Sequence, residues 1–211
     1  MRVFQNWNGA GNFMALMGLV MTSACAPKPG DPAPDPLDFT TTGEALAGQA
    51  AFEADILSNQ FSLTNIQQIP TSGSVGYQGF VQFATAEQAF APADDPLFAI
   101  GRVEMSASFD GTGGISGTAD NFIDGNDNQM TGSMTISADS IDSRSIGTGF
   151  NGTLEGQITS ASNFEYNYQV PTSGFFLGPD ADYIQAGGFG DFTNNDTGEV
   201  TPFEVGILAQ R

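Results

Sequence analysis

The chain has 211 residues, enough for one sizeable domain with terminal tails. Its 24 acidic residues outnumber its 5 basic residues, which gives a formal net charge of −19 at pH 7. Such a surface repels phosphate backbones, anionic membrane surfaces and acidic ligands, so we expect no nucleic-acid partner. Solubility alone also explains the charge, without any cationic partner.

The composition excludes several kinds of catalytic site, metal site and cross-link. The chain has no histidine, and Cys25 is its single cysteine. A Ser-His-Asp or Cys-His arrangement, a His/Cys zinc or haem site and an intrachain disulfide are therefore excluded. The 27 glycines favour short strands and tight turns over helices.

Residues 1–24 are predicted to be a lipoprotein signal peptide. An apolar stretch, FMALMGLVM at 13–21, has the length of a signal-peptide core and is too short to span a bilayer. The following TSAC resembles the lipobox of bacterial lipoproteins, with Thr22 in place of the usual leucine, and predicts a lipid on Cys25. An ordinary secretory signal with a chance cysteine is the alternative.

Residues 25–43 are predicted to be a proline-rich tether, because APKPGDPAPDPLD has little to bury and favours an extended chain. Ala26 gives no obvious inner-membrane retention signal, which favours an outer-membrane anchor. Residues 44–69 form a lead-in with a short helix over about 44–58, where alanines and Phe52 recur at near-helical spacing.

From residue 70 the apolar period becomes two, which predicts antiparallel strands with one dry and one wet face. Three stretches alternate strictly, 99–109, 129–138 and 149–158. Their predicted dry faces are Val103, Met105, Ala107 and Phe109; Met130, Gly132, Met134, Ile136 and Ala138; and Phe150, Gly152, Leu154, Gly156 and Ile158. Weaker runs at 75–83, 114–122, 173–178, 186–193 and 203–210 bring the number to eight.

Eight short strands joined by turns such as FDGTGG and TNNDTGE predict an all-β fold, an eight-stranded antiparallel up-and-down soluble β-barrel over residues 70–211. Glycines among large residues on the dry face suit a narrow, filled interior. The wet face carries Ser, Thr, Gln and Glu, the reverse of a membrane-spanning barrel.

The stretch GFFLGPDADYIQAGGFGDF (174–192) is predicted to be a joint across one barrel end. We expect a strand to end at Gly178 and a single helical turn to start at Pro179, with Asp180 and Asp182 near its positive end. PTSG occurs at 70–73 and 171–174, and each copy is expected to precede a strand.

PTSGSVGYQG followed by GFFLGPDADYIQAGGF is similar to the C-terminal barrel domain of transferrin-binding protein B and its surface-lipoprotein relatives, which include the factor H-binding protein barrel. The resemblance covers residues 70–211 and the lipidated N-terminus. It implies an eight-stranded barrel anchored at the outer membrane. Transferrin itself is not the expected partner, because those receptors pair each of two barrels with a handle domain, for which this chain has little room.

Four groups of residues are candidates for a site. Asp124, Asn126 and Asn128 are spaced like the start of a calcium loop, although a solvated hairpin turn is the simpler interpretation, since Gln129 replaces the needed glycine. Asp180 and Asp182 could form a catalytic carboxylate pair, but their place on a cap is structural. Glu53 and Asp55 are interpreted as a solvated helix face. Tyr77 and Tyr183 are expected to be packed aromatics rather than ligand contacts.

These patterns lead us to expect a non-enzymatic lipoprotein barrel without cofactor or metal. It would be anchored at the outer membrane, face the periplasm or the cell surface, and bind a protein or metal-carrier partner through barrel-end loops. A lipocalin-like barrel with a small ligand inside, a purely structural envelope lipoprotein and a carboxylate-dependent hydrolase are the alternatives.

Overall fold

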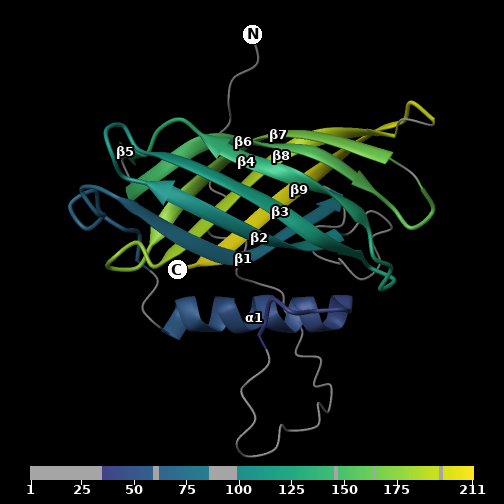
Figure 1. Cartoon of the computed structure of the whole chain (residues 1–211), viewed down its shortest axis with the longest axis horizontal. Coiled ribbons are helices and arrows are strands. Elements are labelled where there is room, and N and C mark those ends of the chain that lie inside the picture. Colours follow the sequence, from purple (N-terminus) through teal and green to yellow (C-terminus); the bar gives the residue numbers. More distant parts are fainter. Residues whose placement is uncertain (1–34, 59–61, 86–98, 145–146, 164, 195–196) are drawn as a thin grey trace, which may run out of the picture. The chain divides into compact units, whose positions relative to one another are not determined.

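The barrel is built from antiparallel strands that follow one another around a ring (Figure 1). This computed structural model describes residues 35–58, 62–85, 99–144, 147–163, 165–194 and 197–211. The predicted signal peptide, Cys25 and most of the predicted tether lie outside the described residues. Residues 35–211 form one compact unit.

The strands are β1 (Ser74–Thr85), β2 (Ala99–Ser108), β3 (Gly114–Asp124), β4 (Thr131–Ala138), β5 (Asp142–Arg144), β6 (Gly147–Thr159), β7 (Glu165–Leu177), β8 (Tyr183–Asn194) and β9 (Val200–Gln210). Each pairs antiparallel with its sequence neighbour, with β4 joining β6, and β1 pairs with β9 to close the ring. The predicted eight-stranded up-and-down barrel is therefore confirmed.

The short strand β5 is an addition to the predicted strands. Both β4 and β5 pair with β6, and four residues, 138–141, face three residues of β6, 150–152. One extra residue on one strand is a β-bulge, which bends the strand without ending it. Thus β4 and β5 are two parts of one barrel position.

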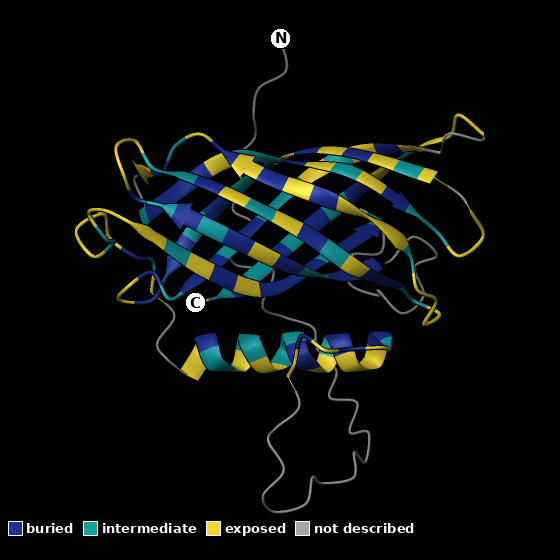
Figure 2. Ribbon diagram, in the orientation of Figure 1, coloured by how far each residue is buried: buried dark blue, intermediate teal, exposed yellow. Residues whose placement is uncertain are grey.

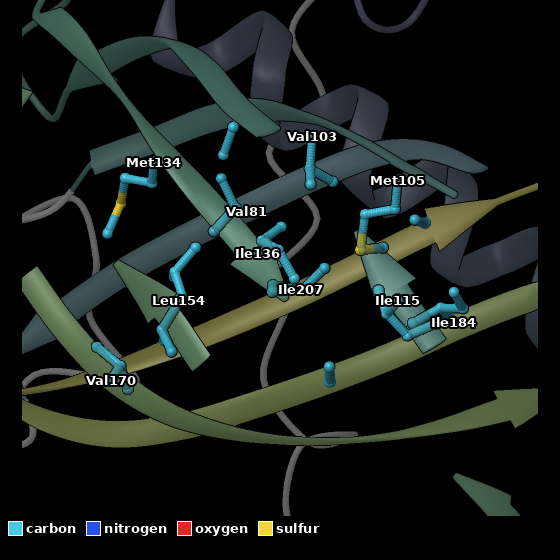
Figure 3. Packing of buried hydrophobic residues seen from close by; sticks show 14 of the residues in the cluster. Val81, Val103, Met105, Ile115, Met134, Ile136, Leu154, Val170, Ile184 and Ile207 are labelled. Carbon is cyan, nitrogen blue, oxygen red and sulfur yellow. The ribbon is translucent and has the colours of Figure 1, made fainter. Parts of the chain in front are cut away.

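The interior is filled by side chains that alternate along every strand, as the bands of buried and exposed residues show (Figure 2). The labelled side chains in Figure 3 come from all eight barrel strands and meet in one cluster. Six large aromatic side chains of the interior, Tyr77, Phe83, Phe122, Phe150, Phe176 and Phe203, have almost no exposed surface. The predicted dry faces are confirmed, except that Met130, Gly152 and Gly156 are only partly buried and Gly132 is exposed.

Two details of the predicted joint are wrong. Strand β7 begins at Glu165, so the second PTSG lies inside a strand, whereas the first copy precedes β1 as expected. Pro171 is tolerated there because the pairing of β7 with β8 is interrupted between Asn167 and Thr172, so no N–H is required on that side. Residues 178–181 form a turn and not a helical turn: Gly178 (φ 87°) and Ala181 (φ 56°) are left-handed, and β8 starts at Tyr183.

The helix α1 (Thr42–Ser58) confirms the predicted helix and begins at a capping box. The Thr41 hydroxyl accepts a hydrogen bond from the Glu44 backbone N–H at 3.2 Å, and the Glu44 carboxylate accepts one from the Thr41 N–H at 3.2 Å. No helix within the described ranges is long and apolar enough to cross a bilayer.

The helix packs against the outer wall of the barrel. Phe80 of β1 points outward beneath it, and its ring lies 5.8 Å from that of Phe39 and 5.3 Å from that of Phe52. Ile100 and Ile123 join the same apolar cluster from β2 and β3. A second cluster forms where Ile56, near the end of the helix, meets Leu177 and Tyr183. The helix therefore covers apolar side chains on the outer wall of the barrel.

Candidate functional site

One end of the barrel is plugged by the chain itself. Ala181 is fully buried, and its carbonyl accepts a hydrogen bond from the hydroxyl of Tyr77 at 2.7 Å. The Thr64 hydroxyl donates to the Gly178 carbonyl at 2.6 Å, and the Arg211 N–H donates to the Asp182 carbonyl at 2.9 Å. We call this the plugged end.

The two aspartates of the plug, Asp180 and Asp182, differ in exposure. Asp180 is exposed, and Asp182 borders a shallow open depression of about 350 Å³ that it shares with Pro179, Tyr183 and Arg211. Neither carboxylate is buried within a cleft. Asp180 is in the turn that closes the plugged end and Asp182 follows it directly, which fits a structural role for both residues.

The two candidate tyrosines are packed, as expected. Tyr77 is 1% exposed inside the barrel, where burial raises the pKa of its hydroxyl above the ordinary value. Tyr183 is on the outer wall, and its hydroxyl donates to the Asp55 carboxylate at 2.5 Å. Tyr183 also borders the depression beside Asp182, and Tyr77 borders a second open hollow beside Phe52 and Gln78.

The solvated face predicted for Glu53 and Asp55 of α1 is wrong. Both are half-buried. Burial raises the pKa of the Glu53 carboxyl, while a hydrogen bond from the Gln49 amide at 3.3 Å acts in the opposite direction. Sequence reasoning missed this position because the helix partner on the barrel was unknown.

The opposite end of the barrel is the end at which β1, β3, β6 and β8 finish, and we call it the loop end. In the β3–β4 hairpin the Asp124 carboxylate accepts hydrogen bonds from the backbone N–H groups of Asn126 at 2.8 Å and Asn128 at 3.0 Å. The Asn128 amide donates to the same carboxylate. The hairpin therefore satisfies Asp124 from within, and calcium is not needed to order it.

This hairpin is docked on the helix and is not simply solvated. The Asp127 carboxylate accepts a hydrogen bond from the Thr42 N–H at 2.7 Å, and the Thr42 hydroxyl donates to the Asp124 carbonyl at 2.6 Å. Asp127 thus supplies an acceptor for a free N–H in the first turn of α1. Among the described residues, no group of three or more acidic or cysteine side chains could hold a metal ion.

Buried aromatic side chains fill the interior of the barrel in the part of the chain that the structure describes. Tyr168 lies with its ring 5.1 Å from those of Phe83 and Phe203, and Phe176 contacts Tyr77, Phe109 and Phe150. Two inward hydroxyls, those of Thr148 and Thr172, have no hydrogen-bond partner. The filled interior favours contacts on the outside of the barrel over a small ligand within it.

Charged contacts are sparse on the described surface. Arg102 lies 3.3 Å from Asp120 and 3.8 Å from Glu104, in an exposed cluster that contributes little stability. Arg144 stacks over the ring of Phe175 at 5.2 Å and donates to the Asn151 amide oxygen. A scan against models of protein families finds no match, and a search of curated proteins finds no matching relative.

Proposed function

We propose that this protein is a non-enzymatic lipoprotein barrel, anchored at the outer membrane by a lipid on Cys25, that binds a protein partner through its loop end. A metal-carrier protein is included among such partners. The observation that carries the proposal is the plug: Tyr77 and the buried Ala181 close one end of the barrel, which leaves the loop end for contacts with a partner.

The packing of the barrel supports binding on its outside. Aromatic rings from β1, β3, β7, β8 and β9 contact one another across the interior, so a small ligand would have to displace packed side chains. Displacement of such side chains costs several kcal/mol, of the order measured for core truncations. Loops on a rigid scaffold can change without this cost, which is why binding residues concentrate on them.

Anchoring is supported by the sequence before the barrel. The only cysteine follows an apolar stretch and small residues, and a proline-rich segment separates it from Asp35. Metabolic labelling with a fatty-acid analogue tests this part of the proposal. We expect the full chain to be labelled and found in the outer-membrane fraction, and Cys25→Ser to lose both properties. Label retained by Cys25→Ser would contradict the anchor.

Partner binding is tested separately with a photo-crosslinking residue placed at two exposed sites. Ala161 lies in the β6–β7 connection of the loop end, and Thr112 lies in the β2–β3 turn of the plugged end. We expect a discrete cross-linked protein from position 161 and none from position 112 in living cells. Equal cross-linking from both sites, or none from position 161, would favour a purely structural envelope role.

A further inference from the structure

Strands β8 and β9 present an exposed apolar patch on the outer wall of the barrel. Phe189 of β8 is 57% exposed and Val200, at the start of β9, is 58% exposed. Pro202 is exposed as well and is the partner of Asp191, while Phe189 is the partner of Glu204. These five outward side chains alternate apolar and acidic groups, and we call them the β8–β9 patch.

Glu204 is an unpaired carboxylate within this patch. It is half-buried between Phe189 on β8 and Ala84 on β1, its partners in the two strand pairs. Burial raises the pKa of its carboxyl above the ordinary value. In the described part of the chain, no ion pair or side-chain hydrogen bond reaches it. A carboxylate that loses water without gaining a partner is unfavourable, and a cation from another molecule would offset this cost.

Phe175 of β7 shows how this barrel holds a cation over an outward aromatic ring. The Arg144 guanidinium lies 5.2 Å from the centre of the Phe175 ring and donates to Asn151 Oδ1 at 2.8 Å. Asn151 is on β6, so the ring and the acceptor come from adjacent strands. Phe189 and Glu204 offer the same combination from β8 and β9, with a carboxylate in place of the amide.

The arginines of the described chain are engaged or placed elsewhere. Arg102 of β2 pairs with Asp120 of β3. Arg144 covers Phe175, and Arg211 borders the depression at the plugged end. A cation on the β8–β9 patch would therefore come from a second molecule.

We propose that the β8–β9 patch binds an arginine side chain of a partner protein, with its guanidinium stacked on Phe189 and paired with Glu204. This inference rests on the proposed function, because it names the chemistry of the partner at the loop end, where β9 begins at Val200. Arginine is favoured over lysine, since its planar guanidinium stacks on a ring while donating to a carboxylate. Val200 and Pro202 would contact apolar side chains beside that arginine. The net charge of −19 favours the encounter.

Titration of the detergent-solubilised full chain with capped tripeptides tests the proposal. The tripeptide Phe-Arg-Phe supplies the arginine, and two counterparts replace it by lysine or by citrulline, its neutral isostere. Amide chemical shifts in β8 and β9 report the affinity at about 0.15 M salt, which screens the general attraction to an acidic chain. We expect the arginine peptide to bind, the lysine peptide to bind about threefold more weakly, and the citrulline peptide not to bind.

Phe189→Ala and Glu204→Gln should each weaken binding of the arginine peptide about threefold to tenfold, because one removes the ring and the other removes the charge. Glu155→Gln and Leu57→Ala are the matched controls, since Glu155 is exposed on β6 and Leu57 is 54% exposed on α1. Both should bind as the unmodified chain does, and circular dichroism checks each fold. Equal binding of the citrulline peptide, equal loss in Glu155→Gln, or no loss in the two folded patch variants would overturn the proposal.

Cross-linking from position 161 in cells distinguishes this inference from the proposed function. Glu204→Gln should lower the yield of the cross-linked protein, whereas Glu155→Gln should not. An undiminished yield in Glu204→Gln would overturn the arginine contact and leave the proposed partner in place. With no cross-link from the unmodified chain, the proposed function fails, and the peptide titration alone decides whether Phe189 and Glu204 bind a guanidinium.

Discussion

The hydroxyl of Tyr183, at the start of β8, donates a hydrogen bond to the carboxylate of Asp55, in the last turns of α1. The two residues are 128 positions apart. The bond ties the end of the helix to the barrel wall, beside the apolar contact of Ile56 with Leu177. Polar and apolar contacts thus hold the same end of α1.

Tyr183→Phe should lower the free energy of unfolding by about 1–2 kcal/mol, because a half-buried hydrogen bond to a carboxylate is lost. Urea unfolding of the full chain measures this. Asp55→Ala alone and combined with Tyr183→Phe completes a double-mutant cycle, for which we expect a clear coupling energy. Strictly additive effects would show that the two side chains do not interact.

At the other end of the helix, Asp127→Ala should destabilise the protein by about 0.5–2 kcal/mol, the usual range for a lost helix-cap acceptor. The Thr42 N–H loses its acceptor from the β3–β4 hairpin. Hydrogen exchange should become faster in the first turn of α1 and in the hairpin together. Asn126→Ala is the control, since only the backbone N–H of Asn126 bonds to Asp124; equal effects would contradict the role of Asp127.

Gly174→Ala should destabilise the barrel by about 1–3 kcal/mol or prevent folding, through overpacking. A Cβ at this inward position would lie 2.4 Å from the ring of Phe150, too close for any contact. Gly76→Ala is the matched control in β1, where a Cβ would meet nothing within 4 Å. It should be neutral or slightly stabilising. A neutral Gly174→Ala would mean that the interior is looser than described.

The barrel could be predicted because strand periodicity is local: Met134 and Ile136 already separate from Thr135 and Ser137 in the sequence. The position of α1 could not, because it depends on barrel residues far along the chain. A signal was nevertheless present. Phe80 precedes inward Val81, and Phe122 precedes outward Ile123, so β1 and β3 are apolar on both faces there. A strand with two apolar faces requires a cover on each.

The candidate site was less predictable for the same reason. The contact of Asp55 could not be predicted, because its partner Tyr183 lies 128 residues further along the chain. Tyr77 was correctly expected to be packed, but its bond to Ala181 arises only when the first strand meets the β7–β8 turn. The prediction of a helical turn at Pro179 is wrong, because Gly178 and Ala181 take left-handed conformations that a helix does not allow.

Glu53→Gln should stabilise the protein at pH 7. Burial raises the pKa of Glu53 in the folded state, so the stability associated with this group is full below its ordinary pKa, about 4.3, and is lost as the pH rises through the raised value. At pH 7 the folded protein bears the cost of a half-buried carboxylate, which glutamine avoids. Thermal unfolding should show a gain at pH 7 that shrinks towards pH 4. A constant gain at both pH values would point to another cause.

At alkaline pH, two buried tyrosines decide whether the free energy of unfolding rises or falls as the pH increases. Burial raises the pKa of Tyr77 and Tyr168 above the ordinary value of about 10. The folded protein therefore keeps two protons that the unfolded chain releases, and the corresponding stability, present below pH 10, is lost as the pH rises towards the raised values.

The free energy of unfolding in urea should consequently fall from pH 9 to pH 11, and it should fall less steeply in Tyr168→Phe, which removes one of the two groups. Absorbance at 295 nm supplies an independent measurement, because the folded chain should show fewer than its four tyrosines ionised at pH 11. Ionisation of all four with the protein still folded would mean that these hydroxyls reach solvent. The filled interior, on which the proposed external binding depends, would then be wrong.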